Sequence, residues 1–142
     1  MAQIRLSVSI DASPERIYPL IAMARGLSRW WATDITETAE TVELGFFNRA
    51  TVYRLQFVRG VEPREAEWRC LTGQEWAGTR LLFGLTQTNG KTLLRFTHAD
   101  WKAETDYFVA CTTTWGELMY RLKATAEGRA PGPLFSAAGM AY

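Results

Sequence analysis

Apolar and polar residues alternate strictly over residues 3–10, QIRLSVSI, near the start of the chain. Successive side chains on a strand point to opposite faces, so Ile4, Leu6, Val8 and Ile10 would share one face. The residues between them are all polar. The segment is therefore predicted to be a β-strand that buries one of its faces.

The next segment carries the signals of a short helix. Ser13 suits an N-cap, and Pro14 suits the first helical position, where a backbone N–H has no partner in any case. Pro19 lies inside the apolar pattern that follows, and we expect it to kink or shorten the helix because it removes a donor. Gly26 is the predicted C-cap.

From about Thr41 to Trp101 the pattern again has a period of two, which is typical of strands. Apolar residues alternate in five short runs, which cover residues 42–46, 53–57, 66–70, 81–85 and 92–98. Thr88-Asn89-Gly90 is a strong hairpin signal between the last two runs. Strands that are joined by tight turns predict an antiparallel meander.

The period changes again after Trp101. Between about Thr105 and Glu127, apolar residues recur at steps of three and four, which predicts a long amphipathic helix that ends at Gly128. The apolar stripe consists of Phe108, Cys111, Trp115, Leu118, Met119, Leu122 and Ala126. We expect one domain over residues 1–128 and a C-terminal tail over residues 129–142.

The order of these elements predicts an α+β fold. A curved antiparallel sheet has to bury one face, and the long C-terminal helix is the only large element that can cover it. We therefore expect the sheet to wrap around the helix and to leave an internal cavity.

The tail carries Leu134, Phe135, Met140 and Tyr142, which should cover an apolar area on the same sheet or on a second copy of the chain, as in a homodimer.

Composition narrows the classes of function. The 142 residues are 47% hydrophobic and include six Trp, but their 16 basic and 15 acidic residues give no excess charge for a nucleic-acid partner. No apolar run could span a membrane, and we expect no secretion signal. Cys70 and Cys111 lie in no metal or redox spacing. We expect reduced thiols, a cytoplasmic location and no metal or cofactor.

Trp30 and Trp31 pose a packing question, because neighbouring side chains point about 100° apart on a helix and to opposite faces on a strand. One face of a core does not easily take both rings. We expect Trp30 to pack in the core and Trp31 to roof the cavity near its entrance. Arg29 and Asp34, on either side of the pair, should stay in water.

Three stretches of the chain together resemble a known family. They are SPERIYPLIAMARGLSRWWAT, GTRLLFGLTQTNGKTLLRFTHADW and TTTWGELMYRLKATAEG. The positions that carry the resemblance are Pro14, Gly26-Leu27, Trp30-Trp31, His98, Trp101, Trp115, Leu118, Leu122 and Glu127-Gly128. The pattern is similar to the activator-of-heat-shock-protein-90-ATPase homologue-like family, in the START-like (SRPBCC) superfamily. The resemblance implies a helix-grip fold, which hosts lipid carriers, cyclases, oxygenase subunits and chaperone modulators.

Aromatic residues at inward-facing positions are the main candidates for a binding site. Pockets for small molecules are mostly apolar, with a few polar groups that fix the ligand. The candidate ligand-binding residues are Trp31, Tyr53, Trp68, Phe83, His98, Trp101, Tyr107 and Trp115. Plain core packing is the alternative, and we expect it to account for about half of these rings.

His98 is the single histidine of the chain and the weak candidate for acid–base catalysis. It should point inward, and Asp100 and Glu104 could orient it. The alternative, which we favour, is a core histidine whose ring nitrogens are hydrogen-bonded. No nucleophile accompanies it in any recognisable motif, so catalytic residues are not assigned.

Three hypotheses of function follow. The sequence favours a non-catalytic domain that binds a small hydrophobic or aromatic ligand. The resemblance implies a second, a protein-interaction module that modulates a chaperone ATPase. The third is a cyclase-like or hydrolase-like enzyme that uses His98.

Overall fold

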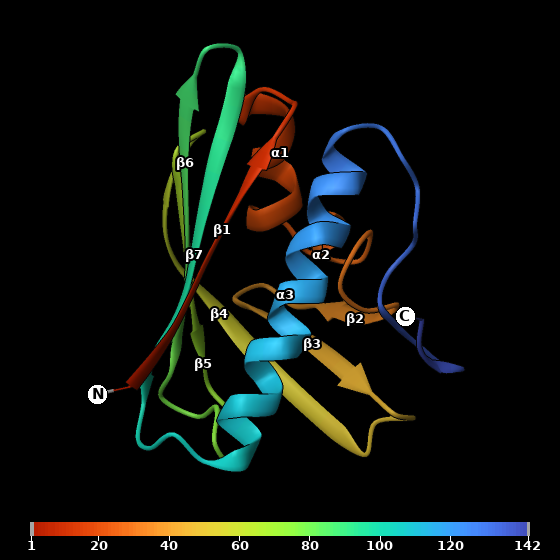
Figure 1. Ribbon diagram of the computed structural model, residues 1–142. Coiled ribbons are helices and arrows are strands. Elements are labelled where there is room, and N and C mark those ends of the chain that lie inside the picture. Colours follow the sequence, from red (N-terminus) through yellow and green to blue (C-terminus); the bar gives the residue numbers. More distant parts are fainter. Residues whose placement is uncertain (1, 142) are drawn as a thin grey trace.

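The computed structural model describes residues 2–141, which form one curved sheet, three helices and a small hairpin (Figure 1). The elements in chain order are β1 (Ala2–Ile10), α1 (Pro14–Ala22), α2 (Ala24–Leu27), β2 (Asp34–Glu37), β3 (Thr41–Phe46), β4 (Thr51–Val61), β5 (Glu65–Cys70), β6 (Arg80–Thr88), β7 (Lys91–Trp101), α3 (Asp106–Ala126), β8 (Phe135–Ser136) and β9 (Gly139–Met140).

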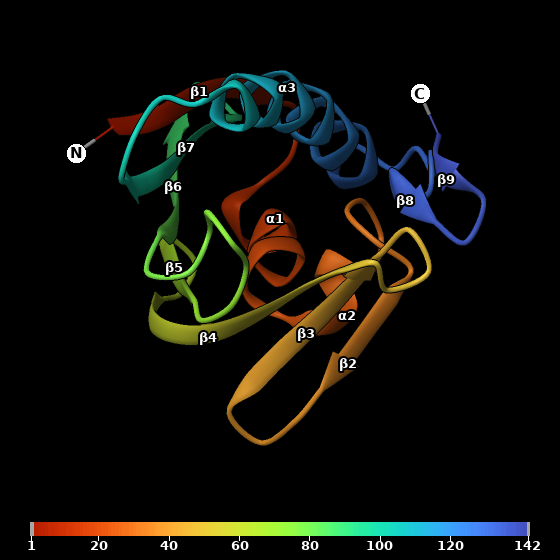
Figure 2. The ribbon, with the colours of Figure 1, turned by 90° about the horizontal axis from the view of Figure 1, so that it is seen from below.

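The large sheet is antiparallel throughout, in the order β1-β7-β6-β5-β4-β3-β2. The first strand pairs with the last strand of the meander, so that Leu6 lies opposite Phe96. Figure 2 shows the sheet curving around α1 and α2, with α3 beside β1 on the open side. The predicted α+β, helix-grip architecture is confirmed.

The alternation of the sequence becomes the burial pattern of the strands. In β1, Ile4, Val8 and Ile10 are buried, and the polar residues between them are exposed. Phe57 departs from the pattern, because a register shift in β4 between Phe57 and Arg59 leaves its ring 38% exposed. The strand β2 was not predicted, since DITE has a single apolar residue and takes its conformation from pairing with β3.

The prediction of Gly26 as a C-cap is wrong. Ser13 does cap α1, since its side chain accepts a hydrogen bond from Arg16 N, but the helix ends at Ala22. Gly26 lies inside the second short helix, α2, where the chain folds back onto α1. A Cβ atom at Gly26 would lie 1.9 Å from the carbonyl oxygen of Pro19, so the close approach of the two helices requires a glycine there.

The helix α3 follows the sequence prediction closely. Thr105 is its N-cap, with a side-chain oxygen 3.2 Å from Phe108 N. Glu127 is the C-cap, and Gly128 follows with a φ of 91°, a value that favours glycine. No helix within residues 2–141 is long and apolar enough to cross a membrane.

The tail packs on its own chain. Leu134 is fully buried, its backbone N donates to Trp30 O at 3.1 Å, and Phe135 N donates to Trp31 O at 3.0 Å. The guanidinium of Arg121 on α3 donates to the carbonyl oxygens of Pro131, Gly132 and Ala141. Tyr142, which we expected to dock with this tail, lies outside the described residues.

Candidate functional site

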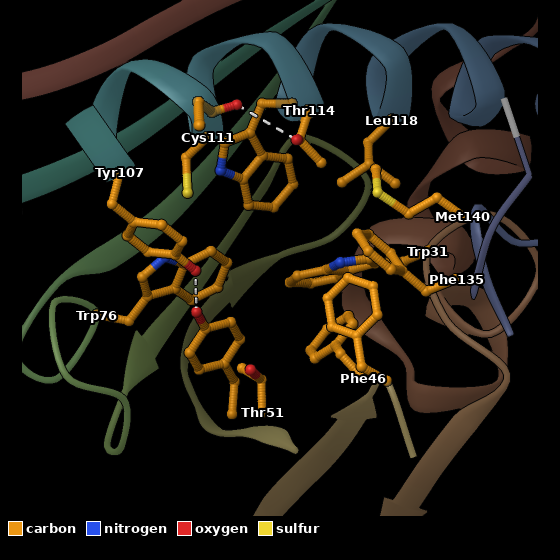
Figure 3. A pocket seen from close by; sticks show the side chains of 14 residues that line it. Trp31, Phe46, Thr51, Trp76, Tyr107, Cys111, Thr114, Leu118, Phe135 and Met140 are labelled. Atoms are coloured by element: carbon orange, nitrogen blue, oxygen red, sulfur yellow. Dashed lines mark hydrogen bonds between the residues drawn. The ribbon is translucent and has the colours of Figure 1, made fainter. Parts of the chain in front are cut away.

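A pocket of about 210 Å³ lies between α3, the β3–β4 hairpin and the tail (Figure 3). It is lined by Trp31, Phe46, Phe47, Thr51, Tyr53, Trp76, Tyr107, Ala110, Cys111, Thr114, Trp115, Leu118, Phe135 and Met140. None of these side chains is charged. The pocket is therefore an apolar, mostly aromatic space with a few hydroxyl groups at its wall.

Five separate parts of the chain supply the walls: the segment after α2, the β3–β4 hairpin, the loop between β5 and β6, α3 and the tail. Tyr107, Cys111 and Trp115 lie four residues apart on α3 and so share one face of the helix. The loop between β5 and β6 supplies Trp76, and the tail hairpin supplies Phe135. Figure 3 shows these side chains converging on one space from opposite sides.

The pocket has a buried floor and an exposed rim. Trp31 and Trp115, whose ring centroids are 5.0 Å apart, are only 2% and 1% exposed. At the rim, Phe47 is 52% exposed and Tyr107 is 40% exposed. Tyr53 lies between floor and rim, with its ring parallel to that of Trp76 at a centroid distance of 4.0 Å.

The paired tryptophans divide between core and pocket as expected, but Trp31 belongs to the buried floor of the pocket and not to a roof near its entrance. The Trp30 ring is fully buried, and its Nε1 donates to Leu20 O at 2.9 Å, so it caps the end of α1. The Trp31 ring stacks on Trp30 at 5.8 Å and turns its other side to the pocket. Arg29 is exposed as expected, and the side chain of Asp34 is 43% exposed although it forms an ion pair with Arg49 at 2.9 Å.

Two tyrosine hydroxyls form the main polar feature of the wall. Tyr53 and Tyr107 are hydrogen-bonded to each other through their hydroxyl groups. Burial is the main cause that raises the pKa of Tyr53 to about 12, and burial also raises the pKa of Tyr107. Both hydroxyls are therefore uncharged at neutral pH.

His98 lies in the core behind the pocket rather than in its wall. Its Nδ1 accepts from Trp115 Nε1 at 3.1 Å, so the proton of the neutral ring is assigned to Nε2, which donates to Thr79 Oγ1 at 2.8 Å. Thr79 Oγ1 in turn donates to Trp76 O at 2.6 Å. Burial lowers the pKa of His98 to about 3, which keeps the imidazole neutral.

The carboxylates that we expected to orient His98 do not contact it. Asp100 accepts instead from Arg80 Nε at 2.6 Å, on the outer side of the sheet. Both ring nitrogens of His98 already have partners, and its position and lowered pKa favour the core histidine over an acid–base group.

The structure brings together half of the predicted ligand-binding residues. Trp31, Tyr53, Tyr107 and Trp115 line the pocket, whereas Trp68, Phe83, His98 and Trp101 lie in the closed core. The indole of Trp68 donates to Ile21 O of α1 at 2.8 Å. Phe83 packs on Phe96 of the neighbouring strand β7 at 5.0 Å, and Trp101 packs on Phe108 of α3 at 5.1 Å.

Several pocket residues were missed in the sequence. Trp76 lies in a loop that carries no periodic pattern, and Phe46 and Cys111 looked like ordinary core positions. Phe135 and Met140 were recognised as apolar residues that need cover, but not as a pocket wall. The tail pattern was the one signal that pointed to them.

Metal ligands do not gather in the part of the chain that the structure describes: no group of three His, Cys, Asp or Glu side chains lies close enough to hold an ion. Cys70 and Cys111 are both free and buried. Burial raises the pKa of Cys70 to about 12 and also raises that of Cys111, which makes both thiols poor nucleophiles.

The fold matches solved structures over most of the chain. The solution structure of the Aha1 dimer from Colwellia psychrerythraea is 28% identical, with a TM-score of 0.80 over 90% of this chain and 98% of that one. This chain is a START-like, helix-grip domain. The family resemblance in the sequence is thus confirmed by a solved structure, although no family model and no curated protein matches the chain.

Two more distant structures share the START-like fold. CalU16 from Micromonospora echinospora is 17% identical, with a TM-score of 0.74 over 92% of this chain and 68% of its own. Protein BH1534 from Bacillus halodurans is 15% identical, with a TM-score of 0.70 over 89% of this chain and 98% of its own. START-like domains include ligand-binding and enzyme-like proteins, so the fold alone does not assign the function.

Proposed function

We propose that this START-like domain binds a small, apolar or aromatic molecule in the pocket between α3 and the tail, and that it does not catalyse a reaction. The observation that carries the proposal is an uncharged aromatic pocket with a buried floor of Trp31 and Trp115. An apolar cavity of about 150 Å³ holds one benzene ring, so about 210 Å³ suits a substituted ring or two fused rings.

The chemistry of the wall supports binding without catalysis. An acid–base group works best when its pKa lies near the operating pH. Burial raises the pKa values of Tyr53, Tyr107 and Cys111, and it lowers that of His98, which lies outside the pocket. The enzyme hypothesis that uses His98 therefore has less support than binding.

A pocket-filling variant tests the proposal. Ala110 lies on the exposed side of α3 and lines the pocket, so Ala110→Phe would place a ring in the space at little cost in stability. Val109→Phe adds a ring at the neighbouring position, which is 58% exposed and points elsewhere. We would titrate both variants and the wild type with single-ring and two-ring aromatic compounds, and follow binding by calorimetry.

Saturable binding to the wild type and to Val109→Phe, with at least tenfold weaker binding to Ala110→Phe, is the expected result. Equal affinities of the two variants would mean that ligands bind elsewhere. Native mass spectrometry of freshly purified protein adds a second readout, because a retained small molecule would be seen directly as added mass.

A second candidate function is favoured by the 28% identity to the Aha1 structure. In this role the chain would bind a chaperone ATPase of the heat-shock-protein-90 class, and change its rate of ATP hydrolysis. Adding the purified chain to such an ATPase distinguishes the two functions. An unchanged rate together with aromatic binding leaves the ligand-binding function.

Two related proposals concern assembly and location. The Aha1 structure is a dimer, which supports a homodimer for this chain, and light scattering after size exclusion would measure its mass. The free thiols of Cys70 and Cys111 fit a cytoplasmic location, which fractionation of the source cells would test.

A further inference from the structure

We infer that the ligand of the pocket is an uncharged aromatic molecule with a hydroxyl or carbonyl oxygen, and that this oxygen binds to the hydroxyl pair of Tyr53 and Tyr107. The inference rests on the proposed function, since it names the class of ligand for the same pocket. Three observations lead to it: the place of the hydroxyl pair, its hydrogen bonds and the absence of charge in the lining.

The hydroxyl pair lies at a boundary between two spaces. On one side is the aromatic pocket, and on the other is a polar cleft that shares Thr51, Tyr53 and Tyr107 with it and adds Gln74 and Glu75. Figure 3 shows Tyr107 at one end of the pocket, away from Phe135, with its hydrogen bond to Tyr53 drawn as a dashed line. A ligand that fills the aromatic space would therefore point its polar atom toward this end.

The pair has hydrogen-bonding capacity to spare. Each tyrosine hydroxyl has one proton and two lone pairs, and the bond between Tyr53 and Tyr107 uses one of the two protons. Within residues 2–141, neither hydroxyl makes a further hydrogen bond to an oxygen or nitrogen atom, and the sulfur of Cys111, which contacts Tyr107, is a weak acceptor. The pair can therefore donate to a carbonyl oxygen, or both donate to and accept from a hydroxyl.

The lining argues against a charged ligand. The residues that line the pocket carry no charged side chain, so a buried carboxylate would lose its hydration without gaining a partner. The carboxylate of Glu75, in the cleft beyond the hydroxyl pair, would in addition repel an anion. Burial raises the pKa values of Tyr53 and Tyr107, so the pair itself stays neutral.

Three compounds with the same ring and ethyl group test the inference. They are ethylbenzene, para-ethylphenol and para-ethylbenzoate, which differ only in the substituent opposite the ethyl group. We expect para-ethylphenol to bind the wild type about three- to tenfold more tightly than ethylbenzene, as for one added hydrogen bond. We expect para-ethylbenzoate to bind more weakly than ethylbenzene.

The variants separate the hydroxyls from the rings. A double variant, Tyr53→Phe with Tyr107→Phe, keeps both rings and should bind ethylbenzene and para-ethylphenol with equal affinity. Tyr120→Phe removes a hydroxyl from the same helix at a side chain that is 65% exposed and outside the pocket, and should keep the preference. Thermal melting of each variant confirms that it is folded.

The outcomes distinguish this inference from the proposed function. Binding of ethylbenzene with no preference for para-ethylphenol overturns the inference and keeps the aromatic pocket as a binding site. A preference that survives in the double variant places the oxygen elsewhere and also overturns it. Failure of all three compounds to bind overturns both.

Discussion

The inner surface of the sheet has two aromatic regions that differ in their cover. The closed region, formed by Trp68, Phe83, His98 and Trp101, lies under α1 and the start of α3. The open region is the pocket, whose outer cover is the β8–β9 hairpin and the turn at Phe47. The rings are of the same kind in both regions. The pocket therefore exists because a small hairpin and a turn, and not a helix, cover the rings of the open region.

The largest effect of a substitution on stability is expected where the two regions meet. Trp115 is 1% exposed, packs on Phe96 at 4.3 Å in the closed region and lies 5.0 Å from Trp31 in the pocket. Trp115→Ala should reduce the free energy of unfolding by about 3–5 kcal/mol, as for other buried rings. Urea denaturation measures this change. A loss below about 1 kcal/mol would mean that the ring is not part of the common core.

The tail, which covers the open region, should contribute less to the free energy of unfolding than Trp115 does. Leu134 is fully buried although it belongs to the tail. Leu134→Ala should cost about 2–3 kcal/mol, near the lower end for such substitutions, because a terminal segment can relax around the gap. The same denaturation experiment measures it, with Ala137→Gly in the β8–β9 turn as a control. An unchanged stability would mean that the tail is not held in place by this side chain.

A decrease in pH should reduce the free energy of unfolding, because His98 is buried as a neutral group in the closed region. Its folded pKa, about 3, lies below the value near 6.5 of an unfolded chain. Between these two values the unfolded state binds the extra proton, so stability is full above about pH 6.5 and falls as the pH decreases toward about 3. From about pH 7.5 to about pH 5, His98 alone should account for a loss of about 2 kcal/mol.

Denaturation of the wild type and of His98→Gln across this pH range measures the effect. A glutamine amide can still accept from Trp115 and donate to Thr79, but it does not titrate. The variant should therefore show a shallower pH dependence. Parallel curves for the two proteins would mean that the imidazole is not held neutral in the folded state.

The smallest effect on stability is expected at the rim. Phe47 is 52% exposed and has a φ of 54°, a conformation that asparagine adopts more readily than phenylalanine. Phe47→Asn should change the free energy of unfolding by less than about 0.5 kcal/mol, as for other exposed sites, while it weakens ligand binding. Calorimetry with para-ethylphenol and urea denaturation together check this separation. An equal affinity would exclude Phe47 from the binding surface.

Local pattern was enough to predict most of the fold. Alternation gave the strands of the meander, and the three- and four-residue steps gave α3 with its ends at Thr105 and Gly128. The failures have physical causes that lie outside the pattern. Gly26 is required by a close contact with Pro19, a residue on another helix, and β2 forms because β3 is there to pair with it.

The candidate site was only half predictable for the same reason. Tyr53 and Trp68 are both inward-facing residues on neighbouring strands, and nothing in their sequence distinguishes them. Trp68 cannot contact a ligand in the pocket, because α1 covers it and the carbonyl oxygen of Ile21 lies 2.8 Å from its indole nitrogen. Tyr53 lies beyond the reach of α1, beside a tail that is close to it only in the folded chain.

The docked tail places the C-terminal segment of the chain beside the pocket. Ala141 N donates to Leu134 O at 2.8 Å, and the same short segment supplies Phe135 and Met140 to the pocket. A dye attached at Ala141 would lie next to the binding surface, while β1 begins at the opposite edge of the sheet. A purification tag therefore belongs at the N-terminus, and a fluorescent label at the C-terminus could serve as a sensor of ligand occupancy.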